Sequence, residues 1–247
     1  MRVLLLAAIG LVAMIGTARA DELRILGAGS LREVISEIRD RYEKATGIKV
    51  AADFGPSGVL RERIEKGEKA DLFASADMGH PRKLLEDGRA VRVTMFTRNA
   101  LCAFATPQVG LTQANFADRL LDPAVKLGTS TPKADPAGDY TWLMFRRIDA
   151  RRPGAYATLD AKAKKIVGGP GPVNGDPVVD GFKSGEIAVM IGYCSGRQRT
   201  AKAIPGIEAV EVPKDIAAGP EYGLAILKGA DPRAGDLTLF MLSPEGQ

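Results

Sequence analysis

The 247-residue sequence has few of the residue types that most often build metal and nucleic-acid sites. It contains one histidine and two cysteines, so a tetrahedral zinc site cannot be assembled convincingly from these side chains. Its 34 lysines and arginines nearly balance its 30 aspartates and glutamates. No block of basic residues occurs, which argues against nucleic acid as a partner. With 45% hydrophobic and 26% charged residues, the composition is that of an ordinary globular protein.

Long apolar runs are also absent, except at the N-terminus. The stretch "MRVLLLAAIGLVAMIGTARA" has a basic residue near its start, an apolar middle and a small-x-small ending in Ala18-Arg19-Ala20. These features are typical of a secretory signal peptide, so we predict a signal peptide over residues 1–20 with cleavage after Ala20. A retained membrane anchor is the alternative. No later segment approaches the ~20 apolar residues that span a bilayer, and we expect an exported protein.

The rest of the chain alternates between predicted strands and predicted helices. Short apolar runs predict strands at 24–28, 48–55, 70–77, 100–107, 126–131, 187–194, 206–213 and 222–229. Helical spacing of apolar residues predicts helices at 31–46, 56–67, 80–90, 114–122, 138–149 and 155–167. This alternation predicts an α/β fold with parallel sheets flanked by helices. The Gly/Pro-rich stretch 168–177 is interpreted as a surface loop.

Three predicted helices start directly after a strand with groups that suit an anion. Ser30 in "GAGSLREV" and Ser57 in "FGPSGVLR" lie beside two of these helix starts, and "DPAGDY" brings the N–H groups of Ala137 and Gly138 to the third. A helix N-terminus presents free N–H groups and the positive end of the helix dipole. A serine there is most often only a cap. Strand ends meet at one sheet edge, so the shared placement favours an anion site.

These motifs, together with the strand "IAVMIGYCSG", resemble the periplasmic molybdate-binding proteins of ABC importers over about residues 23–242. The resemblance implies a type II periplasmic binding protein fold, in which two α/β lobes enclose a ligand cleft. We expect residues 21–98 and 197–247 to form lobe 1 and residues 99–196 to form lobe 2. It also implies a monomer in the periplasm that passes its ligand to an ABC importer permease, with no resident cofactor.

The resemblance further implies that two serine hydroxyls, one tyrosine hydroxyl and two backbone amides hold the anion. Carried over, these are Ser30, Ser57, Tyr193 and the amides of Ala137 and Gly175, the last chosen from residues 174–176. Such a site offers donors and no well-placed acceptor, which suits a fully deprotonated oxyanion such as molybdate or tungstate. Sulfate is the smaller competitor, and another oxyanion or a small organic anion is the alternative.

Two features depart from this family. Tyr193 is followed by Cys194-Ser195-Gly196, which differs from the best-known members and suggests a branch with a different ligand. The printed sequence ends at "LSPEGQ", where the family leads us to expect one more helix.

The two cysteines, Cys102 and Cys194, fall in predicted strands near the two lobe crossings. An oxidising compartment favours their pairing, so we expect a disulfide, with two buried free thiols as the alternative.

A remote alternative is an exported serine hydrolase with Ser57 as nucleophile. The segment "GPSG" departs from the G-x-S-x-G spacing, and His80 would have to be the base. We expect His80 to be a solvated turn residue instead, and we do not expect an enzyme.

Overall fold

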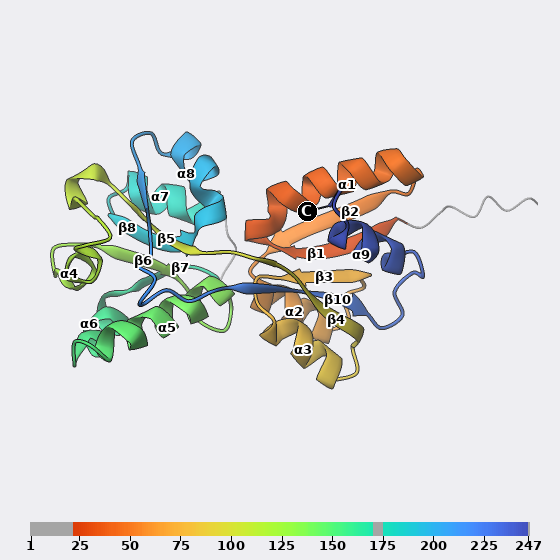
Figure 1. The fold of residues 1–247 in the computed structure, drawn as a ribbon, viewed down its shortest axis with the longest axis horizontal. Helices are drawn as coiled ribbons and strands as arrows, with labels where there is room; N and C mark the ends of the chain where they lie inside the picture. Colours follow the sequence, from red (N-terminus) through yellow and green to blue (C-terminus); the bar gives the residue numbers. More distant parts are fainter. Residues whose placement is uncertain (1–21, 170–174, 247) are drawn as a thin grey trace, which may run out of the picture.

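A computed structural model describes residues 22–169 and 175–246 of the chain. The predicted signal peptide, residues 1–20, and its cleavage after Ala20 lie outside the described residues. Figure 1 shows two lobes lying end to end along the longest axis, each built around its own sheet. Within the described ranges, no helix is long and apolar enough to cross a membrane, and no cluster of three or more His, Cys, Asp or Glu side chains could hold a metal ion.

The first lobe contains a five-stranded sheet in the order β2-β1-β3-β10-β4. Its strands are β1 (Leu23–Ala28), β2 (Val50–Gly55), β3 (Leu72–Ser75), β4 (Ala90–Arg98) and β10 (Glu221–Leu227). Its helices are the 3-10 turn η1 (Gly29–Leu31), α1 (Arg32–Thr46), α2 (Ser57–Glu65), α3 (Gly79–Glu86) and α9 (Ala234–Leu242). Helix α1 buries Ile35, Ile38 and Tyr42 on one face, and it ends at Gly47, whose φ of 73° suits a glycine C-cap.

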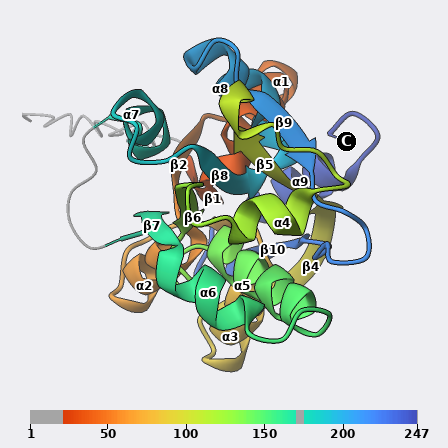
Figure 2. The same cartoon turned by 90° about the vertical axis from the view of Figure 1, so that its left-hand side faces the viewer.

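The second lobe contains a five-stranded sheet in the order β7-β6-β8-β5-β9. Its strands are β5 (Leu101–Ala105), β6 (Leu127–Ser130), β7 (Lys164–Val167), β8 (Val189–Tyr193) and β9 (Glu208–Glu211). Its helices are η2 (Pro107–Val109), α4 (Phe116–Leu121), α5 (Pro136–Asp149), α6 (Ala155–Lys162), α7 (Pro177–Lys183), η3 (Cys194–Gly196) and α8 (Arg197–Ala203). Figure 2 looks onto this lobe and shows α5 and α6 on one side of the sheet, with α7 and α8 on the other.

The two-lobed α/β architecture is confirmed, but the sheets are mixed rather than parallel. Strands β1, β2 and β3 run parallel, whereas β10 is antiparallel to both β3 and β4. In the second lobe β6 is parallel to β7 and β8, whereas β5 is antiparallel to β8 and β9. The antiparallel pairs arise because strands adjacent to the crossings enter each sheet from the other lobe. Local alternation in the sequence carries no information about that direction.

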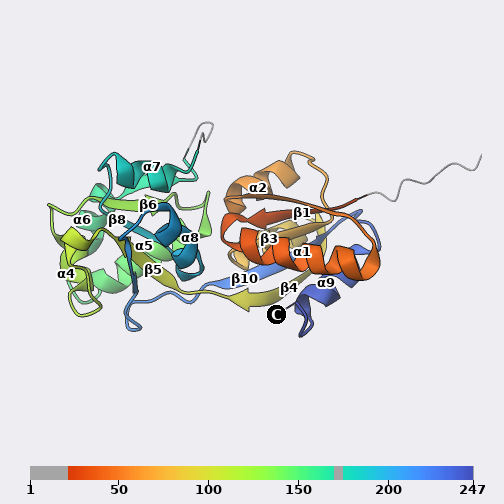
Figure 3. The ribbon, with the colours of Figure 1, turned by 90° about the horizontal axis from the view of Figure 1, so that it is seen from above.

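Two segments join the lobes, as Figure 3 shows from above. The chain leaves the first sheet after Arg98 and returns to it at Glu221, after β9. Because β9 pairs with β5 in the second sheet, α8 and β9 belong to the second lobe. The boundary predicted at residue 197 is therefore too early. The two crossings are tied together where the Asn99 N–H donates to the Pro220 carbonyl at 3.0 Å.

Candidate functional site

A cavity of about 470 Å³ lies between the lobes, within the range of about 300–1,000 Å³ typical of small-molecule sites. Strand ends from both sheets line it: Ala28 of β1, Gly55 of β2, Ala76 after β3, Ser130 of β6, Val167 of β7 and Tyr193 of β8. All five residues expected to hold the anion also line it: Ser30, Ser57, Ala137, Gly175 and Tyr193. The structure therefore brings the predicted site residues together in one cavity.

Ser57 offers a hydroxyl donor on the first lobe. It is the first residue of α2 and only 1% exposed. Its Oγ accepts a hydrogen bond from the Ala76 N–H at 3.1 Å and does not cap its own helix. A serine oxygen that already accepts a fixed N–H keeps its own hydrogen for another acceptor. The hydroxyl of Ser57 can thus donate to a bound anion.

Ser30 lies in η1 and likewise does not cap a helix, because α1 starts only at Arg32. Its Oγ lies 2.9 Å from the Tyr222 hydroxyl. The side-chain amide of Asn99 donates to that same hydroxyl at 2.9 Å and to Ser195 Oγ at 2.8 Å. Tyr222, Asn99 and Ser195 did not emerge from the sequence as site residues. Only the unusual "YCSG" segment around Ser195 had pointed to this region.

Tyr193 reaches the first lobe from the end of β8. Its side chain is buried, and its hydroxyl donates to the Ala76 carbonyl at a long 3.4 Å. Its ring packs 5.6 Å from the ring of Tyr222. Burial raises the pKa of Tyr193 well above its ordinary value, so the hydroxyl keeps its hydrogen. A loosely held donor of this kind can turn to a ligand.

The amide expected from Ala137 already has a partner. Asp135 caps helix α5, and its Oδ1 accepts the Ala137 N–H at 3.1 Å. Asp135 also lines the cavity, and burial raises the pKa of its carboxyl. The sequence "ADPAG" carries the signature of this cap, an aspartate before a proline at the first helical position. The sequence analysis did not anticipate this carboxyl in the cavity that holds the expected anion-binding residues.

Gly175 lines the cavity two residues before the start of α7. It has a φ of 82° and precedes Asp176, which caps α7 by accepting the N–H groups of Val178 and Val179. A left-handed backbone of this kind favours glycine. Asn174, the first residue of the expected segment, lies outside the described residues.

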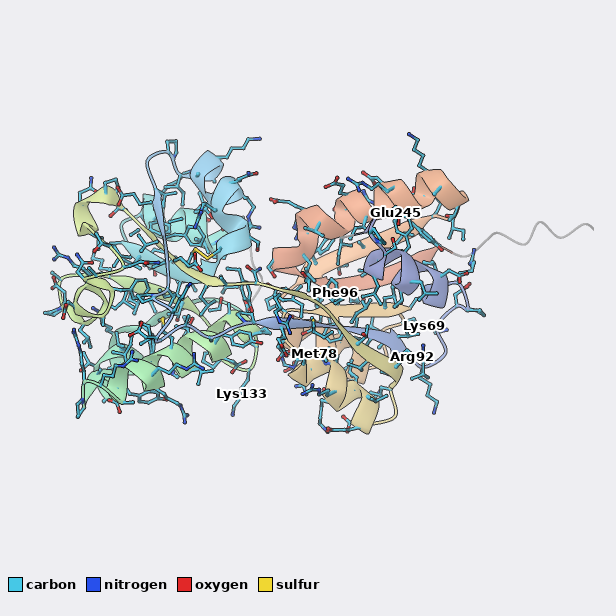
Figure 4. All side chains as sticks on the ribbon, in the orientation of Figure 1. Lys69, Met78, Arg92, Phe96, Lys133 and Glu245 are labelled. Carbon is cyan, nitrogen blue, oxygen red and sulfur yellow. A yellow bond between two sulfur atoms is a disulfide. The ribbon has the colours of Figure 1, made fainter. Side chains whose placement is uncertain are left out.

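The lobes touch beside the cavity at Gly58. Its N–H donates across the gap to the Ala134 carbonyl at 2.9 Å. A Cβ at this position would lie 2.1 Å from the Lys133 carbonyl oxygen and 2.8 Å from that of Ala134, so only glycine allows the approach. Figure 4 shows the Lys133 side chain pointing outward at the boundary between the lobes.

Cys102 and Cys194 form a disulfide, the pairing expected from the sequence. It joins β5 to η3, so Cys194 lies just after its predicted strand, in the turn that carries Ser195.

His80 differs from the expected solvated residue. It is half-buried, its Nε2 has no hydrogen-bond partner among the described residues, and burial lowers the pKa of its imidazole. The partner of Ser57 Oγ is a backbone N–H, whereas a hydrolase would need a base at that oxygen.

The chain has relatives among known proteins, both in sequence and in structure. The chain is similar to an uncharacterized protein of Pasteurella multocida, 36% identical over 209 residues, covering 82% of this chain and 86% of the relative. It is 27% identical over 238 residues to the molybdate-binding protein ModA of Rhodobacter capsulatus, covering 92% and 85%. Among solved structures, the sulfate-binding protein SubI of Mycobacterium tuberculosis superposes with a TM-score of 0.74 at 17% identity, covering 92% and 83%.

The structural similarity to SubI confirms the two-lobed periplasmic binding protein fold. Because the sequence identity is only 17%, it supports the fold and not the ligand. The model of the family described as bacterial extracellular solute-binding protein matches residues 23–247, which is nearly all of the chain beyond the predicted signal peptide. This chain therefore belongs to the family of bacterial extracellular solute-binding proteins.

Proposed function

We propose that the protein captures molybdate or tungstate in the periplasm and delivers it to the permease of an ABC importer. In this proposal the signal peptide is cleaved after Ala20 and the mature protein acts as a monomer. The observation that carries the proposal is the pair of serines, Ser30 and Ser57, that line one cavity without capping their helices. The relation to ModA of Rhodobacter capsulatus supports molybdate as the ligand.

The donors of the cavity match the chemistry of a fully deprotonated oxyanion. Such an anion offers only acceptors, and neutral hydroxyl and amide donors can stabilise it together with helix dipoles. Ser57 has its hydrogen available on the first lobe. On the second lobe, the Tyr193 hydroxyl makes only a long 3.4 Å bond to the Ala76 carbonyl, which it can exchange for a bond to the anion. An anion that accepts from both lobes would hold the cavity closed, as a carrier requires.

A second candidate ligand is a protonated oxyanion, such as hydrogen phosphate or a phosphorylated organic acid. One observation favours it: the carboxyl of Asp135 lines the cavity and could accept a proton carried by the ligand. The cavity volume of about 470 Å³ also leaves room for a ligand larger than a bare tetrahedral anion.

Isothermal titration calorimetry of the mature protein tests the proposal. The ligand panel is molybdate, tungstate, sulfate, phosphate and a phosphorylated organic acid. A hydrogen bond to a charged group is worth about 1.5–3 kcal/mol, so Ser30→Ala and Ser57→Ala should each weaken molybdate binding about tenfold or more. Ser184→Ala is the matched control, because this serine bonds the Gly181 carbonyl at the end of α7 and does not line the cavity.

The outcomes separate the candidates. Tight binding of molybdate by the wild type, with weaker binding by both Ser30→Ala and Ser57→Ala, supports the proposal. Tighter binding of phosphate than of molybdate favours the second candidate ligand instead. Unchanged affinity in both serine variants would remove them from the site. For the remote hydrolase alternative, wild-type protein should hydrolyse a chromogenic ester and His80→Ala should lose that activity while still binding its ligand; a wild type without hydrolysis would exclude the catalytic role.

A further inference from the structure

A continuous chain of hydrogen bonds links the two lobes behind the cavity. It runs from Ser30 Oγ to the Tyr222 hydroxyl (2.9 Å), to the Asn99 side-chain amide (2.9 Å) and on to Ser195 Oγ (2.8 Å). Ser30 belongs to the first lobe and Ser195 to the second, and both line the cavity. Asn99 and Tyr222 lie at the crossings between the lobes.

The direction of every hydrogen in this chain follows from Asn99. Its Oδ1 accepts the N–H of Ala100 at 2.9 Å, which fixes the amide so that its nitrogen faces the two hydroxyls. That nitrogen has two hydrogens and no acceptor capacity. One hydrogen goes to Ser195 and the other to Tyr222, so both hydroxyl oxygens act as acceptors.

Each hydroxyl that accepts from Asn99 must place its own hydrogen elsewhere. Burial raises the pKa of Tyr222 above its ordinary value, so Tyr222 is neutral and donates to Ser30. Ser30 then accepts from Tyr222, and neither its own hydrogen nor that of Ser195 has an acceptor among residues 22–169 and 175–246. Both free hydrogens belong to side chains that line the cavity.

We propose that Ser195 is a further anion-binding residue, and that Asn99 is a positioning residue that turns the hydroxyl hydrogens of Ser195 and Ser30 toward the ligand. This inference rests on the proposed function, because it requires an oxyanion in the cavity. It adds a hydroxyl donor on the second lobe that the family resemblance had not indicated.

The surroundings hold both hydroxyls in place relative to the crossings. Ser195 follows Cys194, which the disulfide joins to β5. The Asn99 N–H is bonded to the Pro220 carbonyl of the other crossing. The amide nitrogen of Asn99 therefore sits at a fixed point from which it reaches one hydroxyl of each lobe.

The test is a double-mutant cycle with sodium molybdate as the probe, measured by calorimetry at pH 8. Ser195→Ala should weaken binding about tenfold, which corresponds to about 1.4 kcal/mol, and Ser195→Thr should restore most of the affinity because it keeps the hydroxyl. Asn99→Asp keeps the side-chain shape but only accepts hydrogen bonds when ionised, so it should turn both hydroxyl hydrogens away from the cavity. In the Asn99→Asp background, Ser195→Ala should weaken molybdate binding less than twofold, because the Ser195 hydroxyl hydrogen no longer faces the ligand.

The Asn99→Asp protein should also recover affinity as the pH falls, more steeply than the wild type, because a protonated carboxyl no longer repels the anion and can donate again; the double-mutant cycle separates the lost donor from the added charge. Ser184→Ala serves as the control that leaves affinity unchanged. An unchanged affinity in Ser195→Ala, or an equal loss in both Asn99 backgrounds, would overturn this inference while leaving molybdate binding by the wild type intact. A wild-type protein that binds no molybdate would overturn the proposed function and this inference with it.

Discussion

Replacing Asp135 with asparagine removes a negative charge from a cavity that we propose for an anion. The side chain accepts the Ala137 N–H at 3.1 Å, the same donor that the resemblance assigns to the ligand. An anion oxygen about 2.9 Å from that nitrogen would lie at most about 6 Å from the carboxylate. At an effective dielectric constant near 20, two unit charges at that distance repel by about 3 kcal/mol.

The expected result is tighter binding. Asp135→Asn should increase molybdate affinity at pH 8 at least tenfold. The repulsion of about 3 kcal/mol between two unit charges corresponds to about a hundredfold, which is the upper limit for each unit of charge on the ligand. Helix α5 should remain intact because asparagine caps helices as well as aspartate does. Calorimetry gives the affinity, and thermal unfolding of the ligand-free protein checks the fold.

The pH dependence follows from the pKa of Asp135, which burial raises. The folded state therefore holds this proton more tightly than the unfolded state does. Its contribution to stability is fully present below the unfolded pKa of about 3.9 and is lost as the pH rises through the folded pKa. Wild-type affinity for molybdate should likewise rise as the pH falls toward the folded pKa, whereas Asp135→Asn should bind with little pH dependence from this site. Weaker molybdate binding by Asp135→Asn would refute the repulsion argument and point to Asp135 as an acceptor for a protonated ligand.

Three further predictions follow from single contacts. Tyr193→Phe should speed molybdate release in stopped-flow measurements while leaving ligand-free stability nearly unchanged, because it removes only a 3.4 Å bond to Ala76; an unchanged off-rate would exclude the hydroxyl from the site. Gly58→Ala should weaken molybdate binding and enlarge the protein in small-angle scattering, because its Cβ would lie 2.1 Å from a carbonyl oxygen of the other lobe, whereas Gly235→Ala, with open space around it, should change neither. Cys194→Ser should lower the free energy of unfolding by about 4 kcal/mol for a disulfide loop with a separation of 92 residues; denaturant titration showing no loss, or two free thiols in the native protein by mass spectrometry, would contradict it.

Local patterns in the sequence predicted most of the elements but not how they are connected in space. The spacing of Ile35, Ile38 and Tyr42 predicted helix α1, because one buried face of a helix leaves a period that a single segment reveals. The helix predicted over residues 155–167 was too long, since α6 ends at Lys162 and β7 follows at Lys164–Val167. The lysines there suit a helix, and only pairing with β6 makes the segment a strand.

Some residues of the candidate site could be predicted from local motifs in the sequence, and others could not. Ser30 and Ser57 were predictable because they occur in motifs beside helix starts. Asn99, Ser195 and Tyr222 were not, because their contacts join positions 96 and 123 residues apart. The sequence before α5 carries the signature of an Asp135 cap, but no local pattern shows that this carboxyl lines a cavity between the lobes.

The late return of the chain, after β9 rather than before α8, has a consequence for how the protein folds. Strand β10 completes the first sheet by pairing with β4, and the Arg98–Glu221 pair at that seam closes a loop with a separation of 123 residues. Closing a flexible loop of that length costs about 4 kcal/mol of chain entropy. If the second lobe folds first, its β5–β9 pairing already brings the two crossings together, and most of that entropy has been lost before β10 arrives. We therefore expect the inserted lobe to act as an intramolecular template for the first sheet. In pulse-labelled hydrogen exchange during refolding, the amides of β5 and β8 should become protected before those of β10, and the reverse order would exclude this route.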